Sequence, residues 1–151
     1  MKEFPCRLHH NTPGWVKENA LFHVRVRVAP EQKPFLTDPA LAPELLAAAR
    51  RYHELSKWWC ELFLVMPDHW HALMVFPREP GMAATIRDWK RGTARFQGVN
   101  WQENFFDHRI RNPQEAEKKW QYIKRNPVVK DLSPHEDDWP WWWSGLEVGA
   151  H

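Results

Sequence analysis

Two histidines separated by one residue are the first candidates for chemistry in this chain of 151 residues. His69 and His71 flank Trp70 at the start of an apolar run that continues to Phe76, and such a run predicts a strand. Because side chains alternate between the faces of a strand, both imidazoles lie on one face, about 7 Å apart, and Trp70 lies on the other. Two imidazoles so placed can share one metal ion. Spacing alone leaves open a second interpretation, in which the histidines lie on a half-buried face without a ligand.

A tyrosine and an asparagine share one side of a helix that we predict near the C-terminal end of the chain. Asn112 caps this helix, Pro113 takes its first position, and Pro127 predicts that it ends at about residues 125–126. Tyr122 borders the packing stripe, so its hydroxyl is free to emerge, and Asn126 lies one turn further on the same side. Considered alone, Tyr122 is more typical of an aromatic residue that packs at the border of a core.

Together these two segments resemble a known family. Residues 66–73 and 122–128 resemble the HUH family of single-strand DNA nucleases, in which two histidines flank a bulky hydrophobic residue. The closer resemblance is to IS200-like one-tyrosine transposases, and closer still to their branch associated with repetitive extragenic palindromes (REP). Residues 138–141, Asp-Trp-Pro-Trp, match a further element of that branch in the same order. The resemblance covers roughly residues 15–144.

This resemblance implies a site and a reaction. It implies that Tyr122 is the nucleophile and that His69, His71 and Asn126 hold Mg²⁺ or Mn²⁺. The protein would then be a metal-dependent tyrosine DNA nickase and transposase that cleaves single-stranded DNA near hairpins or palindromic repeats. The cleavage would leave a 5′-phosphotyrosine and a free 3′-hydroxyl, and a second 3′-hydroxyl could reverse the step and join strands. A structural zinc site is not expected, because the sequence offers no four-ligand set of cysteine and histidine.

Two other functions stay open at this point. A domesticated relative could bind a DNA or RNA hairpin without turnover, through tryptophan stacking and a basic face. Alternatively, His69 and His71 could hold a metal that activates water, as in a phosphoesterase that forms no covalent adduct. Binding alone does not require Tyr122, His69, His71 and Asn126 together. The departures from the family pattern, such as Asp68 where asparagine is frequent, touch none of the proposed ligands.

The remaining elements follow from hydrophobic periodicity. We expect strands at residues 21–29, 58–66, 69–76 and 102–111, a helix that begins near residue 43, and further helices at 81–97 and from 113. This order predicts an α+β fold, a ferredoxin-like βαββαβ sheet with an additional C-terminal helix that carries the tyrosine, as in the HUH nuclease fold. In this topology the first and third strands are neighbours at the centre of the sheet.

Basic residues are expected to surround the histidine pair. The alternation of residues 21–29 places His23, Arg25 and Arg27 on the face that carries His69 and His71. On the helix at 81–97, arginines recur every four residues, a pattern that is also typical of a solvated helix face. As candidate DNA contacts we list His23, Arg25, Arg27, Arg87, Lys90, Arg91, Arg95, Arg109, Arg111, Lys119, Lys124, Arg125, Trp141 and Trp142.

Composition and charge bound the class of protein. We expect one domain over residues 1–151, with an irregular lead-in at 1–20 and an acidic, tryptophan-rich tail at 131–151. The tail lacks lysine and arginine, so the rest of the chain is basic and suits single-stranded or hairpin DNA. Two cysteines and no long apolar run predict reduced thiols and a cytoplasmic, nucleoid-associated protein without a membrane span.

The short link before the last helix favours a monomer in which Tyr122 acts in cis. At least one ring of 141–143 should be exposed or should stack on a base, and the tail could gate the DNA groove.

Overall fold

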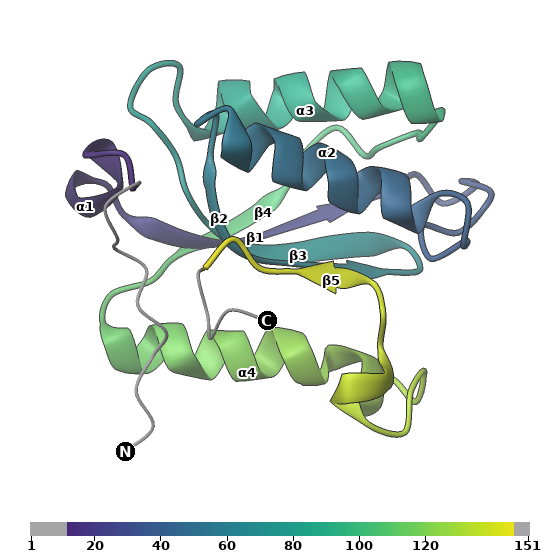
Figure 1. The fold of residues 1–151 in the computed structure, drawn as a ribbon. Coiled ribbons are helices and arrows are strands. Elements are labelled where there is room, and N and C mark those ends of the chain that lie inside the picture. The colour runs from purple at the N-terminus through teal and green to yellow at the C-terminus, as the bar shows by residue number, and fades with distance from the viewer. Residues whose placement is uncertain (1–11, 147–151) are drawn as a thin grey trace.

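The computed structural model describes residues 12–146, so most of the expected lead-in, with Cys6, and the last five residues of the tail lie outside it. Figure 1 shows the chain, whose elements in order are α1 (Trp15–Glu18), β1 (Leu21–Arg27), α2 (Ala42–Glu54), β2 (Trp59–Met66), β3 (His69–Val75), α3 (Met82–Gln97), β4 (Phe106–Arg109), α4 (Pro113–Val129), the 3₁₀ turn η1 (Glu136–Asp138) and β5 (Trp142–Trp143). Within the described residues no helix is long and apolar enough to cross a membrane.

The strands form one antiparallel sheet in the order β4-β1-β3-β2-β5. The predicted βαββαβ arrangement with an additional C-terminal helix is confirmed, and β1 and β3 are neighbours as expected. Their register sets Arg25 opposite His71 and Arg27 opposite His69. In Figure 1, α2 and α3 cover one face of the sheet and α4 covers the other.

The face beneath α2 and α3 is packed with aromatic rings. Trp70 of β3 stacks on Phe63 of β2 with ring centroids 4.5 Å apart, and it meets Trp89 of α3 edge-on at 5.3 Å. Trp58 lies 6.3 Å from Trp70 and donates its indole N–H to the carbonyl of Ala49 at 3.0 Å. These rings are almost fully buried, and each removes a large apolar area from water.

The opposite face carries a second, smaller core. Leu62, Leu64 and Leu73 of the sheet pack with Ile123 of α4 and with Trp139. Because helices cover both faces, every position of β2 and β3 is buried. The sequences of β2 and β3 are therefore nearly continuous apolar runs, without the alternation of apolar and polar residues that a half-exposed sheet shows.

Three predicted boundaries are wrong. Helix α4 does not end before Pro127 but runs to Val129, and the amide of Lys130 donates to the carbonyl of Asn126 at 3.0 Å. Pro127 is buried within the helix, so its packing offsets the missing N–H. The fourth strand covers only Phe106–Arg109 of the expected 102–111, and the supposedly irregular lead-in contains the short helix α1.

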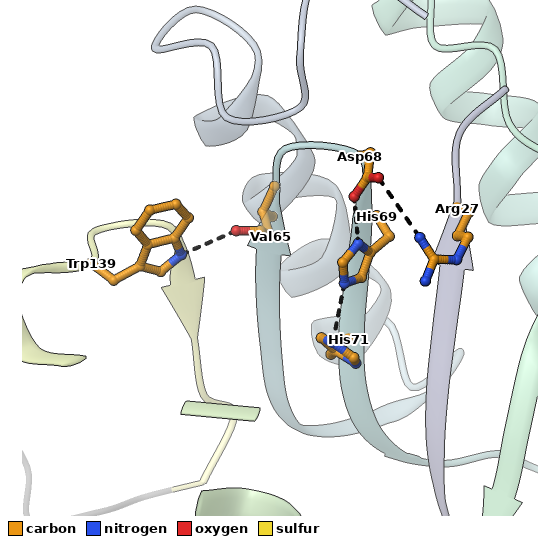
Figure 2. Close-up of polar contacts among 6 residues, drawn as sticks. All are labelled: Arg27, Val65, Asp68, His69, His71 and Trp139. Atoms are coloured by element: carbon orange, nitrogen blue, oxygen red, sulfur yellow. Dashed lines mark hydrogen bonds and ion pairs between the residues drawn. The ribbon is translucent and has the colours of Figure 1, made fainter. Parts of the chain in front are cut away.

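The tail is part of the sheet, which the sequence did not predict. Strand β5 pairs with β2, so that Trp142 lies opposite Leu64 and Trp143 opposite Phe63. Trp139 is buried and donates its indole N–H to the carbonyl of Val65 at 3.0 Å (Figure 2). All three rings of 141–143 are half-buried, because alternate side chains of this edge strand pack on both cores, and the stacking of one of them on a base stays a prediction. The strand also covers the edge of β2.

Candidate active site

The histidine pair of β3 converges on one point. The Nε2 atoms of His69 and His71 lie 3.1 Å apart, and Figure 2 shows the two rings one above the other along the strand. Two nitrogens bound to one octahedral ion at about 2.1 Å would lie about 3 Å apart. The separation therefore fits two ligands of a single ion, the first of the two interpretations that the spacing left open.

The outer nitrogens of both rings have partners that suit such a site. Nδ1 of His69 lies 2.7 Å from Oδ1 of Asp68, and the other carboxylate oxygen of Asp68, Oδ2, lies 3.7 Å from the guanidinium of Arg27 (Figure 2). Nδ1 of His71 lies 3.1 Å from Nε2 of His23. If each Nδ1 carries the hydrogen and donates it outward, both Nε2 lone pairs point into the shared site. Metal-bound histidines are usually oriented by such outward hydrogen bonds.

Burial keeps these imidazoles neutral. Removal from water lowers the pKa of His71 to about 2 and that of His23 to about 4, with smaller contributions from nearby cationic side chains. Burial also lowers the pKa of His69, although the Asp68 carboxylate opposes it. A neutral imidazole keeps a lone pair for a cation, so the protonation states agree with metal binding.

Helix α4 brings an amide oxygen to the same place. Asn126 is only 4% exposed, and its Oδ1 atom has no hydrogen-bond partner among residues 12–146. A buried acceptor without a partner is destabilising, and a cation would satisfy it. Helix α4 continues through Pro127 to Val129, beyond the predicted end. Asn126 therefore lies within the helix, which holds its side chain on a rigid element.

Tyr122 lies one turn before Asn126 and borders the histidines. Its ring centroid is 5.8 Å from that of His71 and 6.1 Å from that of His23, both in edge-on geometry. The side chain is 49% exposed, so a substrate can reach it. Ile123, the next residue, is buried in the core and fixes the orientation of this part of α4.

One cavity of about 370 Å³ joins these groups. Its walls carry the two histidines, Asn126, Tyr122, three cationic residues and two exposed apolar residues; the full lining is Arg25, Arg27, Phe35, Met66, Pro67, Asp68, His69, His71, Tyr122, Asn126, Lys130 and Leu132. Within residues 12–146 no cluster of three histidine, cysteine, aspartate or glutamate side chains forms a metal site. The candidate ligands at this cavity are two imidazoles and one amide oxygen, a donor set whose chemistry suits Mg²⁺ or Mn²⁺ with open positions.

A second cavity of about 710 Å³ adjoins Tyr122 on the other side. It is lined by Arg111, Lys118 and Lys119, and by the pair of His108 and Glu115, whose Nε2 and Oε2 atoms lie 2.6 Å apart. Arg111 and Lys119 thus lie beside the tyrosine, as a DNA-contact role requires. The His108–Glu115 pair was not expected, although β4 places His108 opposite His23.

Other predicted DNA contacts lie elsewhere. Helix α3 covers the face of the sheet opposite the histidines, so its basic residues do not lie beside the site as expected, and their contact with DNA stays a prediction (Figure 1). Strand β1 pairs Arg109 with Phe22, which faces the α2–α3 core, so Arg109 also points away. Arg125 is exposed on α4. The misplaced residues of α3 are Arg87, Lys90, Arg91 and Arg95.

Lys124 and Trp142 contact each other. The ammonium of Lys124 lies 3.4 Å from the centre of the Trp142 ring, and the lysine is only 7% exposed. Burial lowers the pKa of this ammonium. Lys124 is thus not the exposed cation that a DNA contact would use, and it links α4 to β5 instead. Trp141 is half-buried between both cores, and its carbonyl accepts the amide of Val65 at 2.8 Å.

Sequence reasoning missed three residues of the cavity wall. Phe35 belongs to the loop between β1 and α2, and Lys130 and Leu132 follow α4. Their neighbours in sequence carry no periodic signal, and only the folded chain brings them to the histidines. Asp68, which the sequence singled out as a departure from the family pattern, contacts His69 through its carboxylate and orients the ring.

The fold and this arrangement agree with the sequence prediction. The chain has the predicted α+β fold, with two histidines on a central strand and a tyrosine and an asparagine on the helix that packs on the same face of the sheet. No protein-family model matches it. The REP-associated tyrosine transposase of Escherichia coli (strain K12) is 28% identical over 93 residues, which are 60% of this chain and 53% of that protein. The match thus spans about half the length of this curated relative.

A solved structure supports the same resemblance. The structure of a REP-associated tyrosine transposase bound to a REP hairpin has a TM-score of 0.70 to this chain, covering 94% of this chain and 80% of that one, at 19% identity. The two chains therefore share their fold. The resemblance to REP-associated tyrosine transposases that the sequence predicted is confirmed.

Proposed function

We propose that the protein is a metal-dependent endonuclease and strand transferase for single-stranded DNA, of the REP-associated tyrosine transposase type. The observation that carries the proposal is the cavity in which Tyr122, the Nε2 atoms of His69 and His71, and the unpartnered Oδ1 of Asn126 meet. A nucleophile, cation ligands and an entrance for substrate are the components that phosphodiester transfer needs.

The residues divide the chemistry between them. His69, His71 and Asn126 would hold Mg²⁺ or Mn²⁺, which would neutralise negative charge on the scissile phosphate. The Tyr122 oxygen forms a bond to phosphorus while the bond from phosphorus to the 3′-oxygen breaks. Tyrosine loses its proton and the released 3′-oxygen gains one, so a 5′-phosphotyrosine and a 3′-hydroxyl result. Attack by another 3′-hydroxyl reverses these changes and joins two strands.

The proposed substrate is a DNA hairpin with a single-stranded flank. The solved relative is described as bound to a REP hairpin, and the cavity here presents Arg25, Arg27 and Lys130 to an anionic ligand. Cations near the tyrosine on its other side, Arg111 and Lys119, extend this surface. A chromosomal hairpin would place the protein at the nucleoid, in the cytoplasm.

A trapping experiment tests the proposal. The protein is incubated with Mg²⁺ and labelled oligonucleotides that carry hairpins and single-stranded flanks, and covalent adducts are resolved under denaturing conditions. We expect an adduct with the wild type and none with Tyr122→Phe, which removes only a hydroxyl and should still bind DNA. Cleavage without an adduct would instead indicate a water-activating phosphoesterase. Binding without cleavage would indicate a non-catalytic hairpin-binding module.

We also propose that Tyr122 acts on the site of its own chain. Helix α4 packs on its own sheet through Ile123, and the Tyr122 ring lies beside His71 of the same chain. A mixture of Tyr122→Phe with His69→Ala should therefore stay inactive, and the wild type should cleave as a monomer. Restored cleavage in the mixture would mean that the tyrosine helix crosses to a partner.

A further inference from the structure

Exposed apolar side chains gather at the mouth of the proposed active site. Seven large hydrophobic or aromatic side chains of residues 12–146 are substantially exposed, and three of them line the 370 Å³ cavity: Phe35, Tyr122 and Leu132. Phe35 is 53% exposed and Leu132 is 45% exposed. Single exposed apolar residues need no explanation, but a cluster around a cavity indicates a binding surface.

The protein holds Phe35 firmly at this position. The next residue, Leu36, is completely buried in the core, and its amide donates to the carbonyl of Pro67 at 2.9 Å. Pro67 directly precedes Asp68, the residue that orients His69, so the Phe35 loop is tied to the turn that carries the site. The ammonium of Lys33 lies 4.1 Å from the centre of the Phe35 ring. A ring anchored in this way can bind a flat ligand without first becoming ordered.

Leu132 lines the same cavity from the segment that follows α4. It follows α4, and its amide donates to the carbonyl of Pro127 at 2.8 Å. This hydrogen bond folds the chain back after the helix, so Leu132 joins Asn126 and Lys130 on the cavity wall. The loop after β1 and the end of α4 thus each supply one apolar side chain.

We propose that Phe35 and Leu132 form a slot for one unpaired nucleobase of the DNA strand, directly adjacent to the scissile phosphate. The inference rests on the proposed function and names the part of the substrate that this half of the cavity takes. A base attached to a phosphate matches what the cavity offers, because Arg25, Arg27 and Lys130 suit phosphates while Phe35 and Leu132 suit a flat apolar face. A peptide or lipid of purely apolar character would leave these three cations unmatched.

The slot positions the strand rather than reading its sequence. Every base has a π-face, so stacking on Phe35 tolerates all four bases, and Leu132 offers no hydrogen bond to discriminate among them. A base held here fixes which phosphate lies beside Tyr122. Correct placement of the reacting phosphate is a large part of the rate enhancement in such transfers.

Binding and cleavage measurements test the slot. Affinities for a hairpin with a single-stranded flank are measured by fluorescence anisotropy in a Tyr122→Phe background, so that the DNA stays intact. We expect Phe35→Ala to weaken binding about five- to 150-fold and Phe35→Trp to retain it. The matched control is Phe96→Ala, which removes a 75% exposed phenylalanine from α3 on the far side of the sheet and should change nothing.

Abasic nucleotides then locate the bound base. Placed one at a time along the flank, an abasic nucleotide should weaken binding at one position as much as Phe35→Ala does, and the two losses should not add at that position. An unchanged affinity in Phe35→Ala, or additive losses at every position, would overturn the slot. Failure of the wild type to form any adduct would count against the proposed function, whereas the affinities test the slot by themselves.

Discussion

The two faces of strand β3 differ in what they bury. On one face, Trp70 is enclosed by Phe63 and Trp89 at ring distances of 4.5 and 5.3 Å, and none of these three rings is more than 2% exposed. On the other face, His69 and His71 border an open cavity of about 370 Å³. Adjacent residues of one strand thus belong to a dry aromatic core and to a polar site.

A small domain can therefore carry a site that is unfavourable for folding, because the two faces of the strand have different roles. Neutral buried histidines and the unpartnered oxygen of Asn126 do not stabilise the chain in the absence of a ligand. The burial of large aromatic rings on the opposite face favours folding. Strand alternation separates the two tasks, so substitutions on one face should affect function and substitutions on the other should affect stability.

The largest expected effect is on catalysis. His69→Ala or His71→Ala should lower Mg²⁺-dependent cleavage by more than the roughly 10- to 100-fold that loss of an outer partner costs a metal site. The protein should remain folded, as thermal unfolding followed by circular dichroism would show. His135→Ala, in an exposed turn, is the matched control and should keep full activity. Unchanged cleavage in His71→Ala would mean that the two histidines do not bind a metal needed for cleavage.

The residue between the two histidines should behave in the opposite way. Trp70→Ala should lower the free energy of unfolding by about 3–5 kcal/mol, because it leaves a large cavity among the buried rings. Trp70→Phe keeps a ring and should recover part of the loss. Tyr122→Phe, at a half-exposed position, should stay within about 0.5 kcal/mol of the wild type. Denaturant titration measures the free energy of unfolding of all three variants. A Trp70→Ala variant as stable as Tyr122→Phe would show that the aromatic face is not the face that stabilises the fold.

A smaller effect is expected where the tail joins α4. The buried contact of Lys124 with the Trp142 ring should stabilise the protein by about 1–2 kcal/mol. A double-mutant cycle of Lys124→Met and Trp142→Leu should show this coupling energy, and Lys118→Met, an exposed lysine on the same helix, should show none with Trp142→Leu. A coupling near zero would mean that the contact contributes nothing to stability.

The smallest effect should come from the basic stripe of α3. Arg91 is 72% exposed in its side chain and forms a long ion pair with Asp88 at 3.8 Å. It belongs to α3, which covers the face of the sheet opposite α4 (Figure 1). Arg91→Ala should therefore leave cleavage within about twofold, whereas Arg25→Ala should weaken DNA binding and reduce its salt dependence by about one phosphate contact. Equal losses in both variants would show that DNA reaches both faces.

The sequence predicted those parts of the molecule that rest on local periodicity. Strand alternation placed His23, Arg25 and Arg27 beside the histidines correctly, and the order of elements led to the right sheet. Helical spacing put Tyr122 and Asn126 on one side of α4, although whether they act together chemically remains a prediction.

The errors arose where tertiary contacts override local rules. Pro127 does not end α4, because its burial offsets the lost hydrogen bond. The tryptophan-rich tail becomes an edge strand only because the edge of β2 is free to pair with it, and no periodicity in two residues can show that. Phe35 and Leu132 are distant in sequence and carry no pattern, so only the folded chain reveals that they share a cavity.

The identity of the nucleophile is the most direct test of the account. The chain contains two tyrosines: Tyr122 borders the histidines, and Tyr52 lies on α2, where its ring packs edge-on against Trp58 beneath the other face of the sheet. The covalent adduct with labelled DNA is digested with protease, and the DNA-linked peptide is identified by mass spectrometry. The account predicts a nucleotide on the peptide that contains Tyr122. A nucleotide on Tyr52, or cleaved DNA with no linked peptide at all, would contradict it.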